Sequence, residues 1–210
     1  MKPLAKIYNK LYSFYGPQCW WPGDTPFEIA VGAILTQNTN WGNVEKAIKN
    51  LKNARALSVK ALHELPLHEI ALLIKPAGYF NVKAKRLKSF VDFLVKNFNS
   101  SMEKMKKEDM ESIRKKLLDV HGIGPETADS ILLYALNKPV FVIDAYTKRV
   151  LSRHKILDYD ASYTEYQNLF HKELDEDIQM FNEYHALFVR IGKDFCKPRP
   201  LCERCPLSDF

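Results

Sequence analysis

The acidic residue Asp144 stands where a carboxylate could do chemistry. It follows the apolar run Val140-Phe141-Val142-Ile143 and opens a segment with helical spacing. A carboxylate at such a position can assist the attack of water or stabilise a developing positive charge. Aspartate is also a common helix N-cap, so this pattern alone leaves both roles open.

A glycine turn earlier in the chain could hold an anion. The turn His121-Gly122-Ile123-Gly124 follows an amphipathic helix that ends near Val120, and Pro125 suits the first position of the next helix. Backbone N–H groups exposed at such a turn can bind a phosphate of DNA. A Gly-x-Gly turn alone is nevertheless a weak sign of DNA binding.

Three tryptophans are candidates for a pocket that binds an aromatic ligand. Trp20 and Trp21 stand beside Pro22 in a short loop, and Trp41 opens a helix. Tryptophan has a large apolar face that can stack on an extruded base. Core packing at a domain junction, or a hydrophobic staple in the case of Trp41, is the alternative.

A polar run and a basic segment are candidates for contact with DNA. Gln37 and Asn40 belong to a run of amide and hydroxyl side chains that ends a helix at Trp41. Lys83, Lys85 and Arg86 open a later helix, whose basic residues we expect to face mostly outward. A charge run is usually a solvated helix face, so this feature alone does not indicate DNA.

The C-terminal cysteines indicate a metal site. Cys196, Cys202 and Cys205 have the spacing C-x5-C-x2-C, and such crowding favours a metal or cluster in a reducing compartment over disulfides. A [4Fe–4S] cluster needs four thiolates. Cys19 is remote in sequence and a poor fourth ligand. An incomplete cluster, or zinc in its place, is the alternative.

The hairpin at 121–124, together with the Val-Ile-Asp segment that ends at Asp144, resembles the helix-hairpin-helix DNA glycosylases of the endonuclease III superfamily. The resemblance implies that Asp144 is catalytic and that Gln37 enters the gap left by an extruded nucleotide. It further implies a [4Fe–4S] cluster, although the first cysteine gap is one residue short and the fourth ligand would fall just beyond Phe210. The DNA-binding residues that we infer are Gln37, Asn40, Lys83, Lys85, Arg86, His121, Gly122, Ile123, Gly124 and Thr127.

Glu126 bears on the type of glycosylase. Members that also cut the backbone carry a lysine at this position, two residues after the second hairpin glycine, and that amine forms a Schiff base with C1′. A carboxylate cannot do so, and we therefore expect a monofunctional enzyme. The tryptophan loop, the polar run and Gly-Pro-Glu-Thr-Ala-Asp resemble the bacterial 3-methyladenine glycosylase III branch. Its cationic substrate suits a pocket of Trp20, Trp21, Pro22, Trp41 and Glu126.

Three alternatives stay open. One is an endonuclease III-like glycosylase and AP lyase for oxidised pyrimidines, and another is a mismatch glycosylase. The third is a non-catalytic helix-hairpin-helix DNA-binding protein, in which Asp144 would be only a cap.

Composition agrees with a polyanionic partner. Lys and Arg outnumber Asp and Glu by 31 to 25, giving a net charge of +6, although a solvated lysine-rich surface would give the same excess. No apolar run reaches the roughly 18 residues needed to span a bilayer, and the start does not resemble a signal peptide. We expect a cytoplasmic, nucleoid-associated monomer that binds damaged double-stranded DNA.

The elements that must position these residues are all predicted to be helices. Apolar residues recur at helical spacing through the chain, and no strand-like alternation persists. Residues 99–110 are polar and predict a loop or short turn. The resemblance implies a six-helix barrel over 23–133, which contains the hairpin. A second helical domain would join 1–22 to 134–210, with the iron–sulfur loop at 196–210.

Overall fold

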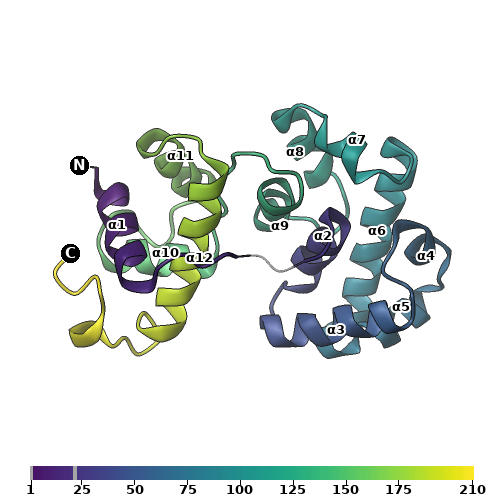
Figure 1. Ribbon diagram of the computed structural model, residues 1–210, viewed down its shortest axis with the longest axis horizontal. Helices are drawn as coiled ribbons and strands as arrows, with labels where there is room; N and C mark the ends of the chain where they lie inside the picture. The colour runs from purple at the N-terminus through teal and green to yellow at the C-terminus, as the bar shows by residue number, and fades with distance from the viewer. Residues whose placement is uncertain (1, 21–22) are drawn as a thin grey trace. The chain divides into compact units, whose positions relative to one another are not determined.

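The computed structural model describes residues 2–20 and 23–210, and within these ranges it consists of helices and loops without a β-strand (Figure 1). The prediction of an all-α protein is confirmed. The chain forms two compact units. One joins the residues up to Trp20 to Pro139–Phe210, and the other holds the stretch between them, up to Lys138.

The middle unit, up to Lys138, is built around one apolar helix. Ala30, Val31, Ile34 and Leu35 of this helix, α2, are fully buried, and α2 packs against α3, α6, α9 and η2. A helix with apolar residues on most of its sides belongs in a core, and the one charged side chain of α2, Glu28, pairs with Lys52. The helices are α2 (Pro26–Leu35), α3 (Trp41–Asn53), α4 (Val59–Glu64), α5 (Leu67–Leu73), η1 (Lys75–Ala77), α6 (Phe80–Phe98), α7 (Met102–Lys106), α8 (Met110–Leu118), α9 (Pro125–Ser130) and the π-helical η2 (Ile131–Ala135).

The unit formed by both ends of the chain is built around α12, which packs against α1 and α10. Its core is aromatic: the Phe141 and Phe170 rings stack with centroids 3.6 Å apart, and Phe181, Tyr184 and Phe188 surround them. An ion pair between Lys10 and Asp209 joins the two terminal segments. The helices are α1 (Pro3–Tyr15), α10 (Ala145–Arg153), α11 (Tyr163–Glu173), α12 (Ile178–Asp194) and η3 (Cys202–Arg204).

One sequence expectation needs correction, and one stays a prediction. The stretch 99–110 contains the short helix α7, because Ser101 caps it and Met102 and Met105 are buried. The domain division at 23–133, with its six-helix barrel, remains a prediction.

Candidate active site and nucleic-acid interface

Asp144 is the N-cap of α10 and is almost completely buried. Its Oδ1 accepts hydrogen bonds from the Thr147 backbone N–H (2.7 Å) and from Thr147 Oγ1 (2.8 Å), which leaves Oδ2 for another partner. Burial raises the pKa of this carboxyl, but the His185 imidazole and the Thr147 bonds more than offset that effect, so the pKa lies below its ordinary value. The site therefore favours the ionised carboxylate.

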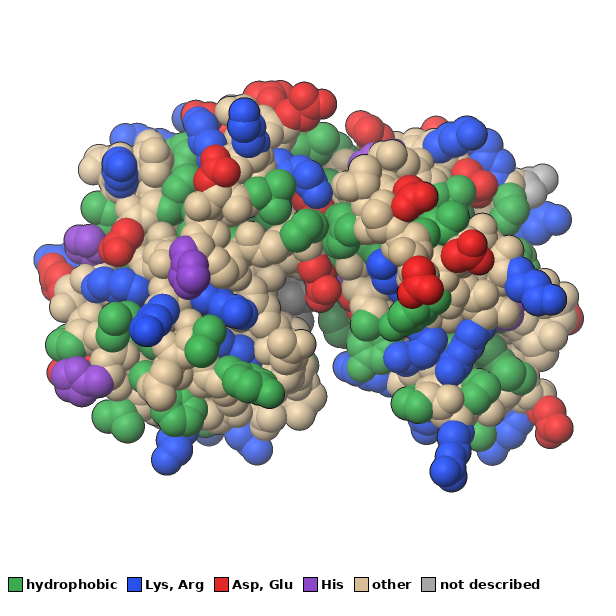
Figure 2. All heavy atoms as spheres, turned by 180° about the vertical axis from the view of Figure 1, so that it is seen from behind, with side chains coloured by type: hydrophobic (Ala, Val, Ile, Leu, Met, Phe, Trp, Pro, Cys, Tyr) green, Lys and Arg blue, Asp and Glu red, His purple; other side chains and the backbone are tan. Residues whose placement is uncertain are grey.

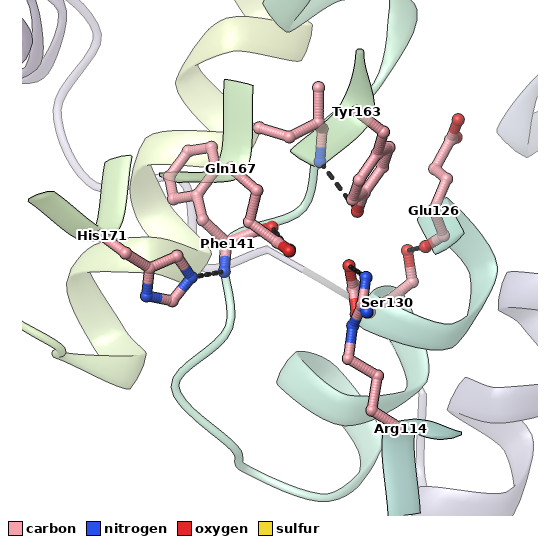
Figure 3. Close-up of polar contacts among 9 residues, drawn as sticks. Arg114, Glu126, Ser130, Phe141, Tyr163, Gln167 and His171 are labelled. Carbon is pink, nitrogen blue, oxygen red and sulfur yellow. Dashed lines mark hydrogen bonds and ion pairs between the residues drawn. The ribbon is translucent and has the colours of Figure 1, made fainter. Parts of the chain in front are cut away.

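The segment that leads to Asp144 is held by one face of α11 (Figure 3). Tyr163, Gln167 and His171 are spaced four residues apart, so they project from the same side of the helix. His171 Nε2 lies 3.3 Å from the Phe141 N–H, Gln167 Nε2 donates to the Phe141 carbonyl at 2.8 Å, and Tyr163 Oη lies 3.3 Å from the Ile143 N–H. These side chains satisfy backbone groups of an extended segment that has no strand partner among the described residues.

His185 is a site residue that sequence reasoning missed. It belongs to the buried side of α12, and its Nε2 lies 3.5 Å from Asp144 Oδ2. The sequence did carry a signal. Positions 181, 184, 185, 188 and 192 form one helical stripe, in which histidine is the only ionisable side chain apart from the Tyr184 phenol.

The glycine hairpin lies between α8 and α9, as predicted. Gly122 has φ +85°, which favours glycine, and a Cβ placed there would lie 2.2 Å from Arg86 Cγ. Ile123 is buried and anchors the turn, whereas His121 and Gly124 are exposed. The hairpin is therefore a tight turn that packs directly against a side chain of α6.

Gln37 bonds the hairpin to the turn after α2. Its Nε2 donates to the Gly122 carbonyl at 3.0 Å and to Thr127 Oγ1 at 2.9 Å, while Arg86 Nη1 donates to Gln37 Oε1. Four predicted DNA-binding residues thus meet in one network. The amide of Gln37 would have to leave these partners to enter a DNA duplex. Asn40 has a separate task, since its side chain caps α3 by accepting from the Asn43 N–H.

The basic residues of α6 differ in their placement. Lys83 is only 1% exposed, so the expectation that it faces outward is wrong. Its Nζ donates to the Leu35 and Ala77 carbonyls, both at 2.8 Å, and thereby closes the ends of α2 and η1. Burial, with a smaller effect of Arg86, lowers the pKa of Lys83 to about 8. Lys85 is exposed and Arg86 is half-buried.

Helix α9 carries the exposed Glu126, seen in Figure 3, and the buried carboxylate of Asp129 three residues further on. Asp129 is fully buried and accepts two bonds from Arg114, at 2.7 and 3.0 Å. Ser130 Oγ donates to the Glu126 carbonyl at 2.7 Å. The Arg114–Asp129 pair fixes α8 against α9 and so helps to define the hairpin between them.

The predicted pocket residues are only partly described. Trp21 and Pro22 lie outside the described residues. Trp20 is half-buried, with Lys193 Nζ 5.9 Å from its ring centroid. Trp41 Nε1 donates to Glu45 Oε1 at 2.9 Å. The Trp41 ring borders a cavity of about 460 Å³, whose other lining residues are Gly23, Asp24, Glu28, Glu45, Ile48, Lys49, Lys52 and Asn53.

The three C-terminal cysteines lie in different surroundings. Cys196 is buried and its Sγ lies 3.3 Å from Arg153 Nη1, Cys202 is exposed, and burial raises the pKa of the Cys205 thiol. Within the described part of the chain, no group of three His, Cys, Asp or Glu residues is arranged to hold a metal ion.

On the face shown in Figure 2, Lys and Arg side chains (blue) are spread widely and alternate with acidic ones (red). Among the described helices, none is long and apolar enough to cross a membrane.

The helical fold, the glycine hairpin and the buried helix-capping carboxylate together define the helix-hairpin-helix class of base-excision repair glycosylases. The model of the HhH-GPD superfamily of base excision DNA repair proteins matches residues 31–176, and the chain belongs to this family.

Relatives and solved structures agree with that assignment. A Methanocaldococcus jannaschii protein with the provisional name DNA repair glycosylase MJ1434 is 47% identical over 99% of this chain and 94% of its own length. The H. pylori 3-methyladenine DNA glycosylase (MagIII), bound to 1,N6-ethenoadenine, is 31% identical with a TM-score of 0.80, over 90% of this chain and 97% of its own. An endonuclease III–DNA complex shares the fold, with a TM-score of 0.84 at 21% identity over 100% of this chain and 95% of its own.

Proposed function

We propose that this protein is a monofunctional DNA glycosylase that hydrolyses the N-glycosidic bond of alkylated purines, such as 3-methyladenine, in duplex DNA. The observation that carries the reaction type is Glu126, which occupies the position after the hairpin where a lyase needs an amine. The substrate class rests on the 31% identity to the H. pylori 3-methyladenine DNA glycosylase over nearly the whole chain.

In this proposal Asp144 acts as a carboxylate. An alkylated purine carries a positive charge, so the electron pair of the breaking C1′–N bond leaves with a base that becomes neutral. The sugar then develops positive charge at C1′, which a nearby carboxylate stabilises. Water attacks C1′ and gives up its proton to Asp144 or to solvent. The lowered pKa of Asp144 suits the stabilisation of the positive charge, because it keeps the carboxylate ionised.

The substrate pocket that we propose is aromatic and acidic. Trp20, Trp21, Pro22 and Trp41 would supply apolar surface, and an indole face attracts a cationic base. The carboxylate of Glu126 would favour the same positive charge. The bond from Trp41 to Glu45 and the cavity beside it support the role of Trp41 in particular.

We propose that the hairpin holds one strand of DNA through its backbone. His121, Gly122, Ile123 and Gly124 would offer N–H groups to a phosphate, with Thr127 completing the start of α9. Gln37 would fill the gap of the extruded nucleotide, with Asn40 shaping its turn, and Lys85 and Arg86 would face the backbone phosphates. Lys83 is left out because it is buried. A monomer acting in the cytoplasm, at the nucleoid, stays a prediction.

The test is release of free base from methylated duplex DNA by the native protein and by Asp144→Asn. We expect the native protein alone to release 3-methyladenine, while both bind the duplex with similar affinity. Absence of release from methylated DNA, with release from oxidised or mismatched duplexes, would reject the alkyl-purine specificity and keep the reaction. Equal behaviour of the two proteins in every assay would support a non-catalytic DNA-binding protein.

The lyase question has its own test. Borohydride reduction should trap no covalent complex between the native protein and DNA, and the product strand should stay uncut at the abasic site. Glu126→Lys should form a trappable Schiff base, because it restores the amine. Glu126→Gln is the matched control, since it removes the charge without adding a nucleophile. Trapping with the native protein would overturn the monofunctional assignment.

A further inference from the structure

His185 is a buried histidine beside the carboxylate of Asp144. Its side chain is 4% exposed, and its neighbours in α12, Tyr184, Ala186 and Leu187, are buried in the core. Burial of a polar ring in such surroundings costs free energy unless it has a polar or charged neighbour. That neighbour is Asp144, whose Oδ2 lies 3.5 Å from Nε2.

The distance between the two groups is set by helix packing. Gly192 lies two turns after His185 on α12, and a Cβ there would lie 2.3 Å from the Tyr146 ring, next to Asp144. Glycine thus lets α10 and α12 approach closely. Arg149 fastens the contact, since it donates to the Gly192 carbonyl at 3.1 Å and to the Cys196 carbonyl at 2.7 Å. The close packing of α10 on α12 therefore places the His185 imidazole opposite the Asp144 carboxylate.

The charged groups around this pair have other partners. On α10, Lys148 donates to the Ala161 carbonyl and Arg153 to the Lys197 carbonyl. On α12, Arg190 pairs with Asp194. Glu183 accepts from the Gln18 and Cys19 N–H groups, and Lys193 lies over the Trp20 ring. Glu173 accepts from the Leu4 N–H, and His171 lies beside Phe141 and Glu176. Arg149 has the two carbonyl partners given above.

The two oxygens of Asp144 thus have different neighbours. Oδ1 is tied to Thr147 within its own helix, whereas Oδ2 faces the His185 imidazole. We propose that His185 is a positioning residue that orients Oδ2 and keeps Asp144 ionised under mildly acidic conditions. This proposal rests on the proposed function, because the ionised Asp144 carboxylate is needed there for base release.

The physical argument is a balance between burial and charge. Burial raises the pKa of the Asp144 carboxyl, and the His185 charge, followed by the Thr147 bonds, lowers it. An opposite charge at such a distance typically lowers a carboxyl pKa by about 1 to 3 units. Loss of the His185 charge should therefore raise the pKa of Asp144 and move its titration to higher pH.

The experiment compares the native protein with His185→Gln, which keeps a polar side chain but not the charge, and with His185→Phe, an apolar variant of similar size. Carbon-13 NMR follows the Asp144 carboxyl against pH, with Asp144→Asn identifying its signal. A pH profile of single-turnover base release is the second readout. His63→Gln is the matched control, since His63 pairs with the exposed Asp92 on α6.

We expect the Asp144 titration and the acid limb of base release to move together to higher pH in either His185 variant, and neither to move in His63→Gln. An unchanged Asp144 titration in a folded His185 variant would overturn the proposal. If the native protein releases no base at any pH while the His185 variants still shift the Asp144 titration, the proposed function is rejected and the coupling between Asp144 and His185 stands.

Discussion

At the scale of single residues, burial changes what a charged side chain does. Lys83 and Lys85 are neighbours in one basic run, yet the first closes two helix ends from inside the core and the second faces solvent. A buried ammonium must be matched by acceptors, and here two backbone carbonyls supply them. The Arg114–Asp129 pair applies the same rule to opposite charges.

The lowered pKa of Lys83 predicts a specific pH dependence of stability. Below about pH 8 the folded and unfolded chains both carry the proton, and the native state bears the cost of the buried charge. Between that value and the ordinary lysine pKa of 10.5, only the unfolded chain keeps the proton, so this residue makes the free energy of unfolding rise with pH. Urea unfolding from pH 7 to about 9.5, below the ordinary pKa of tyrosine, would measure it.

Lys83→Met should be less stable than the native protein at neutral pH, since two buried carbonyls lose their donor. Its free energy of unfolding should also lack the rise with pH. Lys85→Met is the control and should keep it. Equal slopes in all three proteins would contradict the prediction.

Removal of one partner of the buried Arg114–Asp129 pair should be costly. Arg114→Met leaves the fully buried carboxylate without its bidentate partner, and we expect a loss of about 3 kcal/mol in the free energy of unfolding. The double variant Arg114→Met with Asp129→Leu should recover much of it, because an apolar pair needs no charge balance. Denaturant unfolding checks both variants, and a single variant as stable as the native protein would refute the prediction.

At the scale of elements, glycines decide how closely segments approach. Gly122 brings the hairpin onto the Arg86 side chain of α6, and Gly192 brings α12 onto Tyr146 of α10. Both sites place a predicted functional group. The first presents the hairpin backbone, and the second sets His185 opposite Asp144. Helix α11 positions a third segment, since three side chains on one of its faces contact the backbone that leads into α10.

The hairpin offers a matched pair of glycine substitutions. Gly122→Ala meets both a positive φ and Arg86 Cγ at 2.2 Å, so we expect a loss of about 1–3 kcal/mol in stability and weaker binding of duplex DNA. Gly124→Ala meets nothing within 4 Å and has φ −93°, so its stability should stay close to native. Thermal unfolding compares the two variants, and equal stability of Gly122→Ala and Gly124→Ala would contradict the prediction.

At the scale of the whole molecule, a net charge of +6 predicts DNA binding that weakens with salt. Neutralised phosphates release counterions, so the logarithm of the binding constant should fall linearly with the logarithm of salt concentration. Fluorescence anisotropy with Asp144→Asn would measure binding without turnover. Lys85→Gln should reduce the magnitude of the slope by about one, as expected for loss of one phosphate contact.

Lys60→Gln is the matched control, because it makes the same change in net charge at an exposed position of α4. It should leave the slope nearly unchanged. Equal effects of the two substitutions would show that overall charge, and not the basic end of α6, governs binding.

The sequence by itself determined the class of this protein. Helical periodicity predicted its helices, the Gly122–Gly124 turn and its Pro125 start predicted the hairpin, and the apolar run before Asp144 predicted a helix-capping carboxylate. These are local properties, because caps, turns and helix periods depend on residues only a few positions apart.

Only the tertiary structure decided which side chains meet. A basic run cannot show that Lys83 turns inward, since this depends on the carbonyls of Leu35 and Ala77. The pairing of His185 with Asp144 joins positions 41 residues apart through the packing of α12 on α10. Such contacts depend on how closely helices approach, and here that closeness comes from glycines whose partners lie far away in the sequence.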